Sequence, residues 1–222
     1  MDNHKKAVMM KRIERTMKNL QKNNMEAYYV DRKEEVAGLV SQLLKEGDLV
    51  VTGGSVTLNE TGVIELLRSG RYDFRDRHLP NLTPEQVREV FLAAFHADTY
   101  LCSANAITEE GELYNVDGNS NRVAALLFGP KSVIVVAGIN KIVRNLEEAV
   151  QRVKTVAAPC NCHRLGNSTY CHETGYCRGA GSDCMTAGCE SDSRICCNYV
   201  VSAKQRHKGR IKVILVGEEL GY

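Results

Sequence analysis

The sequence predicts an α/β fold in which a mostly parallel sheet carries helices on both faces. Short apolar segments alternate along the chain with amphipathic segments of helical period, and this alternation is typical of parallel sheets. The most apolar segment, Val133 to Val136, is a continuous hydrophobic run typical of a strand in the middle of such a sheet. A capping box at Thr83-Pro84-Glu85-Gln86 marks one helix start.

The first half of the chain is predicted to contain two helices and two strands. Residues 8–20 carry apolar side chains at helical spacing among lysines and arginines, which indicates a helix on the outside of the domain. Residues 25–30 and 49–52 are short runs with aromatic and β-branched side chains, typical of strands. Residues 36–44 follow a helical pattern that stops at Gly47.

The second half continues the alternation. The capped helix is followed by a strand, and two short runs around a glycine-containing loop then predict a hairpin. An Asn and a Glu three residues later cap a further helix, and the last strand is purely apolar. These elements are expected at residues 84–95, 99–103, 106–108 with 113–115, 123–128, 133–136, 145–156 and 213–216. We expect residues from about 25 to 156, together with the final strand, to form one sheet.

The composition indicates one cytoplasmic domain of ordinary size. The 222 residues are 43% hydrophobic, enough for a buried core in a single domain over residues 1–222. A net charge of +2 implies no general attraction to nucleic acid or to a membrane surface. The polar start, Met1 to Lys6, does not resemble a secretory signal, and no apolar run approaches the ~20 residues of a membrane helix. We therefore expect a cytoplasmic protein with no nucleic-acid partner and no membrane span.

Cysteines are concentrated in one polar segment. Eight of the nine lie between Cys160 and Cys197, among Gly, Ser and Asp residues, where they cannot all be buried as small apolar side chains. Because cytoplasmic thiols are kept reduced, such a cluster more often forms a metal site than a disulfide framework. A redox-active disulfide and a reduced structural cluster remain the alternatives. Residues 158–200 are expected to be a metal-binding loop inserted before the last strand.

Two polar loops are candidate ligand-binding sites. In the first, a glycine pair and two hydroxyls follow a strand, where backbone N–H groups can bind an anion. The same residues would serve equally well as a strand-to-helix turn with an ordinary cap. The second loop could orient a polar ligand or simply turn the chain. The two loops contribute Gly53, Gly54, Ser55 and Thr57, and then Asn115, Asp117, Asn121 and Arg122.

Three residues are candidates for catalysis. Lys141 closes the central strand at the end where α/β sheets bind ligands, although a lone lysine is more often simply solvated. Glu60 and Asp117 are acid–base candidates if the two loops converge on one cleft.

Several short motifs, in one order, resemble those of the lactate-utilisation (LUD) domain family. They are Gly53-Gly-Ser-Val-Thr-Leu-x-Glu-x-Gly62, Asn105-Ala-Ile-Thr-x-x-Gly111, Asn115-Val-Asp-Gly118, Asn121-Arg-Val-Ala124, Gly138-Ile-Asn-Lys141 and Val213-Ile-Leu-Val-Gly-Glu-x-Leu-Gly221. The resemblance covers nearly the whole chain. It implies a fold of the phosphosugar isomerase and CoA-transferase type, with the loops at Gly53 and Asp117 placed where those enzymes bind anionic substrates.

The resemblance also implies a set of metal ligands. The short form of the family ends with cysteine motifs that match Cys171, Cys177, Cys184 and Cys196. Four thiolates are the number that a zinc ion or a 4Fe–4S cluster takes. We favour the iron–sulfur cluster, because ligand spacings of five and six residues fit a zinc ribbon poorly. Either Cys160 or Cys162 could replace one of the four, and Cys189 and Cys197 are expected to be spare.

The function implied by the resemblance is that of a redox protein. It would bind a small anionic metabolite, lactate or a related small carboxylate, and work beside iron–sulfur partner proteins. The chain is then a candidate subunit of an oxidoreductase acting on lactate or a similar 2-hydroxy acid. The alternative is a non-redox metabolite-binding or regulatory protein with structural zinc in the cysteine segment. A monomer and a homo-oligomer both remain open.

Overall fold

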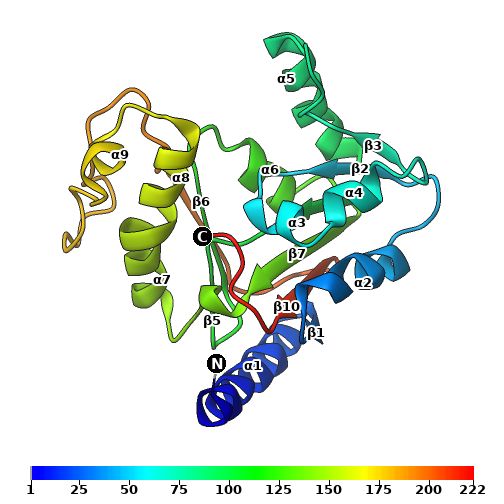
Figure 1. Cartoon of the computed structure of the whole chain (residues 1–222), viewed down its shortest axis with the longest axis horizontal. Coiled ribbons are helices and arrows are strands. Elements are labelled where there is room, and N and C mark those ends of the chain that lie inside the picture. The colour runs from blue at the N-terminus through cyan, green and yellow to red at the C-terminus, as the bar shows by residue number, and fades with distance from the viewer. Residues whose placement is uncertain (1) are drawn as a thin grey trace.

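Two sheets form the framework of the protein, as the computed structural model of residues 2–222 shows (Figure 1). The larger sheet has six parallel strands in the order β1-β10-β7-β4-β2-β3. These strands are β1 (Glu26–Val30), β2 (Leu49–Thr52), β3 (Asp73–Arg75), β4 (Thr99–Cys102), β7 (Ser132–Gly138) and β10 (Ile211–Val216). The predicted α/β fold with a mostly parallel sheet is therefore confirmed.

Strand β7 lies inside the larger sheet, between β10 and β4. Val133 and Val135 belong to the core on one face of the sheet, and Ile134 and Val136 to the core on the other. This alternation is what a strand buried on both faces requires, since successive side chains point to opposite faces. The predicted central position of residues 133–136 is confirmed.

Helices cover both faces of the larger sheet, as predicted. On one face lie α2 (Val36–Leu43), α3 (Val56–Glu60) and α4 (Val63–Leu67). On the other lie α1 (Asn3–Lys22) and α6 (Asn121–Leu127). A further helix, α5 (Pro84–Ala93), begins at the predicted capping box and projects from the body (Figure 1). None of the helices in residues 2–222 combines the length and apolarity needed to cross a bilayer.

The prediction of a single sheet is wrong. The predicted hairpin forms, but its strands belong to a second sheet with the order β8-β5-β6-β9. This sheet consists of β5 (Ala106–Thr108), β6 (Leu113–Asp117), β8 (Ile142–Val143) and β9 (Asn198–Ser202). Strand β9 was not predicted, and it pairs with all five residues of β6, which draws the hairpin into a separate sheet. The edge strand β3 was also not predicted, because three residues are too short for their alternation to be recognised as a strand.

Helix α1 holds the tip of the hairpin. The Asn19 side chain donates to the carbonyl oxygen of Glu109 at 2.7 Å, and the buried Glu109 carboxylate is paired with Arg12 and Arg15. Gly111 turns the hairpin with a φ of +80°, and a Cβ at this position would lie 2.6 Å from the backbone of Asn19. Both the backbone angle and the close approach therefore require glycine.

One long helical rod leads from the second sheet toward the cysteines. It comprises α7 (Leu146–Arg152), a π-helical turn (Val153–Ala157) and α8 (Ala158–Leu165). The predicted end near residue 156 is wrong because the chain stays helical through the π turn, which ends shortly before Pro159, and continues as α8. Helix α8 ends at Gly166 in the left-handed conformation.

The cysteine lobe, residues 158–197, contains α8, the short helix α9 (Tyr170–Thr174) and a series of turns. The cysteine segment was expected to be a loop, but it begins as a helix and returns to the second sheet through β9. A small apolar cluster on the second sheet anchors the lobe, with Val153, Ala158, Cys196 and Tyr199 among its members.

Candidate functional site

A cavity of about 440 Å³ lies at the carboxyl ends of β2, β4 and β7. Parallel sheets bind ligands at this end, where the connecting loops gather. One wall comes from the loops after these strands, through Gly54 to Thr57, Ser103 to Asn105, and Lys141. The opposite wall comes from the end of β6, the helical rod and residues 192–196 of the cysteine lobe. The cavity therefore lies between the larger sheet and the lobe.

Lys141 is the most informative side chain in this cavity. It is 2% exposed, and its amine donates to Thr57 Oγ1 at 3.0 Å and to Ser103 Oγ at 2.9 Å. Within residues 2–222 no carboxylate lies within ion-pair distance of it. Burial, reinforced by the positive charges of Arg152 and Arg122, lowers the pKa of Lys141 to about 7. The amine therefore changes charge near neutral pH, and an anion beside it would favour the charged form.

The two predicted loops do meet at this cavity. Gly54, Ser55 and Thr57 line it together with Asp117 and Arg122. The first loop is shorter than expected, because α3 begins at Val56 with Ser55 as its cap. Gly53 and Asn115 lie behind the lining, and neither Asn121 nor Glu60 is part of it. The carboxylate of Glu60 instead accepts the backbone N–H of Gly221 at 2.7 Å.

Arg122 and Asp117 hold the second loop in place. The Arg122 guanidinium donates to Asn115 Oδ1 at 2.7 Å, to Asn105 Oδ1 at 3.0 Å and to the carbonyl oxygen of Val116 at 2.8 Å. The Asp117 carboxylate accepts backbone N–H groups at the start of α6, including those of Arg122 and Val123. Most hydrogen-bonding capacity of the pair is thus used within the protein, and the acid–base role expected of Asp117 stays a prediction.

Two further cations lie at the rim, and sequence reasoning did not identify them. Arg164 lines the cavity from α8, and Arg77 lies over Gly54, where a Cβ would be 2.4 Å from its Nη2. Neither forms an ion pair with a carboxylate in the described chain. Burial lowers the pKa of Arg77, and the charge of Arg164 lowers it further. Nothing in the sequence marked Arg164, because it lies beyond the predicted end of its helix.

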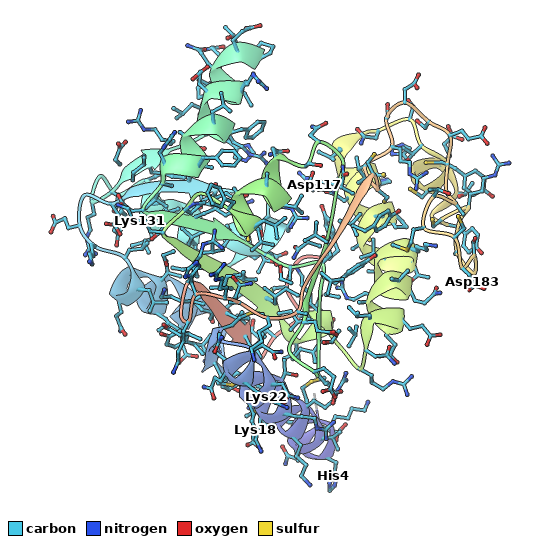
Figure 2. The ribbon with its side chains drawn as sticks, turned by 180° about the vertical axis from the view of Figure 1, so that it is seen from behind. His4, Lys18, Lys22, Asp117, Lys131 and Asp183 are labelled. Atoms are coloured by element: carbon cyan, nitrogen blue, oxygen red, sulfur yellow. The ribbon has the colours of Figure 1, made fainter. Side chains whose placement is uncertain are left out.

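A second, smaller cavity of about 30 Å³ lies inside the cysteine lobe. Three of the four predicted metal ligands line it: Cys171, Cys177 and Cys196. Two cysteines outside the predicted set, Cys162 and Cys189, also line it. Cys184 does not line it. Figure 2 shows Asp183, the neighbour of Cys184, at the far end of the lobe, away from Asp117 at the end of β6.

The five lining thiols influence one another. Burial, together with the thiols of Cys162, Cys177 and Cys171, raises the pKa of Cys196 to about 12. All nine cysteines of the chain are free. Within residues 2–222, no three Cys, His, Asp or Glu side chains are arranged as they would be around a bound metal ion. Cys196 also lines the larger cavity, so a wall one residue thick separates the two cavities at this point.

Solved structures that align with this chain have low sequence identity to it. A DUF162 family protein from Deinococcus radiodurans aligns with a TM-score of 0.49 at 17% identity, over 95% of this chain and 98% of that one. The beta subunit of eIF2B from Chaetomium thermophilum gives 0.37 at 15% identity, over 51% and 43% of the two chains. Ribose 5-phosphate isomerase from Plasmodium falciparum gives 0.34 at 13% identity, over 79% and 78%. A search of curated proteins found no significant match.

The decisive comparison is with protein families. The model of the LUD domain matches residues 13–216, which include the sheets, the cavity and the cysteine lobe. The match agrees with the resemblance found in the order of the short sequence motifs. The chain belongs to the LUD domain family, which is linked in general to lactate utilisation.

Proposed function

We propose that this LUD domain is a redox protein that binds a small anionic metabolite in the 440 Å³ cavity and an iron–sulfur cluster in the cysteine lobe. The family link makes lactate or a related small carboxylate the first candidate for the metabolite. Iron–sulfur partner proteins would exchange electrons with the cluster of this protein. The two parts of this proposal rest on different residues and can be tested separately.

The buried amine of Lys141 is the observation that supports the metabolite site. A charged group without a counter-ion is costly inside a protein, and a bound carboxylate or phosphate would supply the missing charge. The hydroxyls of Thr57 and Ser103 hold the amine in place. Lys141 is therefore a ready partner for one anionic group of a ligand.

The rim cations favour a ligand with a second anionic group. The positive charges that act on Lys141 are those of Arg152 and Arg122, whereas Arg77 and Arg164 act on each other at the rim. A volume of about 440 Å³ falls within the range of pockets that hold drug-sized ligands, and a three-carbon acid does not need that much space. A carboxylate at Lys141 and a phosphate or second carboxylate at the rim would use both regions.

The same lysine would orient the substrate for oxidation. Oxidation of a 2-hydroxy acid to a 2-oxo acid releases two electrons and two protons. Lys141 in its charged form would hold the carboxylate, and the hydroxyl proton would leave to solvent. A two-electron acceptor on a partner protein would take the C2 hydrogen with its electron pair. The cysteine-bound cluster would supply one-electron transfer to iron–sulfur partner proteins. Glu60 lies outside the cavity lining, so Lys141 is better placed than Glu60 to contact the substrate.

Calorimetric titration tests the metabolite site. The probes are L-lactate, pyruvate, inorganic phosphate and 3-phosphoglycerate, which carries both a carboxylate and a phosphate. We expect Lys141→Met to weaken binding at least tenfold. Lys131→Met is the matched control, because Lys131 is exposed and paired with Asp98, and it should bind as the wild type does. Absence of binding by all four probes, or equal affinity in Lys141→Met, would overturn the site.

Metal analysis tests the redox part. The residues fit a thiolate-bound group, since five cysteines line one small cavity. Anaerobically purified protein should contain iron and acid-labile sulfide and absorb broadly in the visible region. Zinc without iron would instead support the non-redox alternative, in which the metal only stabilises the lobe.

A further inference from the structure

The cavity inside the lobe identifies a different set of metal ligands from the one that the sequence motifs suggest. We propose that one metal centre is held by four thiolates drawn from Cys162, Cys171, Cys177, Cys189 and Cys196, with Cys184 excluded. This inference rests on the proposed function, because it assigns ligands to the metal of the lobe. The proposed set omits Cys184, which the motifs matched. It adds Cys162, expected above as a possible replacement, and Cys189, expected to be spare.

The fold brings these five thiols together from separate elements. Cys162 is buried on α8, and Cys171 is buried on α9. The two helices pack together, and Thr169 caps α9 while its hydroxyl lies 3.4 Å from the Cys171 sulfur. Cys177, Cys189 and Cys196 come from the turns that follow. Two ligands thus have a helical scaffold, and the others lie on turns that can move toward a bound metal, as metal binding and folding are often coupled.

The charges around the cavity complement a thiolate centre. Four thiolates with Zn²⁺, or with an oxidised 4Fe–4S cluster, carry a net charge of −2. Lys154, Arg178 and Arg194 line the cavity, and no carboxylate does. Lys154 is 4% exposed and has no carboxylate partner within residues 2–222. Its amine donates to the carbonyl oxygens of Gly179 at 2.9 Å and Ser182 at 3.3 Å. A buried cation beside neutral thiols is uncompensated, and beside thiolates it is paired.

The remaining thiols of the segment lie outside the cavity. Cys160, Cys184 and Cys197 are exposed. The Cys184 sulfur lies 2.9 Å from Thr186 Oγ1, and Cys197 donates to the carbonyl oxygen of Arg194 at 3.3 Å. Their exposure and local hydrogen bonds give them no part in enclosing the cavity.

The cavity size bears on which metal is bound. A volume of about 30 Å³ is about that of one water molecule, so a single ion fits without rearrangement. A 4Fe–4S cluster requires the walls to move apart. Thiolate coordination is common to both, and metal analysis separates them.

Paired double variants test the ligand set. Cys162→Ser/Cys189→Ser leaves three thiols in the cavity, too few for a four-thiolate centre. Cys160→Ser/Cys184→Ser is the matched control, since it removes two thiols from the same lobe but none from the cavity. For each protein we would measure zinc, iron and sulfide after anaerobic purification. The apo-proteins would then be titrated with Co²⁺, whose sulfur-to-metal charge-transfer band reports bound thiolates.

We expect wild type and control to retain the same metal content and the same Co²⁺ band. The Cys162→Ser/Cys189→Ser variant, called the inner variant below, should lose at least 90% of the metal and most of the Co²⁺ band. Both variants should keep the circular dichroism of folded sheets and should still bind phosphate, because neither the sheets nor the Lys141 region is altered. Full metal in the inner variant, or loss in the control, overturns the ligand set alone. Wild-type protein that contains neither iron nor zinc would overturn the metal part of the proposed function as well. Wild-type protein that binds no anion would contradict only the metabolite site.

Discussion

Replacing Lys141 by methionine is expected to stabilise the protein while it removes the anion site. Methionine nearly matches the lysine stem in volume and needs no counter-charge. The wild-type amine has a pKa of about 7 in the folded protein, against an ordinary value of 10.5. The folded state therefore binds this proton less tightly than the unfolded chain does, and at neutral pH the difference costs stability.

The size of the effect follows from these two values. At pH 7 the pKa difference corresponds to about 4 kcal/mol of destabilisation by Lys141. The substitution also removes the hydrogen bonds to Thr57 and Ser103, at about 1 kcal/mol each. A net gain of about 2 kcal/mol remains, which raises Tm by about 4–8 °C for a domain of this size.

The pH dependence gives the sharper test. Between about pH 7 and pH 10 the unfolded chain binds more protons than the folded one, so this group makes wild-type stability rise with pH. Near pH 10 the gain falls below about 1 kcal/mol, and the two lost hydrogen bonds then make Lys141→Met the less stable protein. Thermal unfolding at pH 7, 8.5 and 10, in buffers without phosphate or carboxylate, measures this reversal, with Lys131→Met as the exposed control. A variant less stable than wild type at pH 7, or a gain that does not change with pH, would refute the reasoning.

Three other predictions follow from the same structure. Lactate binding should weaken from about pH 7 upward, by up to tenfold per unit, because the free amine of Lys141 loses its charge there; calorimetry should show this slope in wild type and none in Lys141→Met. Glu109→Gln should lower the free energy of unfolding by about 2 kcal/mol in urea, since it leaves two arginines without their buried carboxylate; an unchanged midpoint would contradict this. Gly111→Ala should cost at least about 1 kcal/mol, because of the positive φ and the contact with Asn19, and should cost more than Gly70→Ala, where φ is also positive but the space is open.

The larger sheet could be predicted because most residues of its inner strands are apolar. Strands β7 and β10 are buried on both faces, and burial of that kind requires the hydrophobic runs that the sequence displays. Membership of the second sheet could not be predicted in the same way. Whether the hairpin joins one sheet or another depends on β9, which pairs with β6 across more than eighty residues of chain. A five-residue strand after a cysteine segment has no local signal of such a partner.

The candidate site could also be predicted from the sequence only in part. The loop at Ser55 and the strand end before Lys141 were recognisable, because ligand loops follow strands in α/β folds. Which of Cys184 and Cys189 lines the smaller cavity could not be recognised, because the sequence does not show the direction in which a cysteine on a turn points. The glycine-rich turns of residues 179–188 decide which thiol faces inward, and their conformation depends on packing against the rest of the lobe.

The π turn in the helical rod sets an angular register for everything that follows it. A π turn accommodates one more residue than the α turn it replaces, and each residue of an α-helix advances it by about 100°. Arg164 and Cys162 lie on α8 after this turn, one lining the larger cavity and the other the smaller. Deleting Thr155 would restore an unbroken helix and swing both side chains about the axis together. An insertion or deletion in the rod before Cys162 would therefore rotate Cys162 and Arg164 together, and so change the linings of both cavities at once.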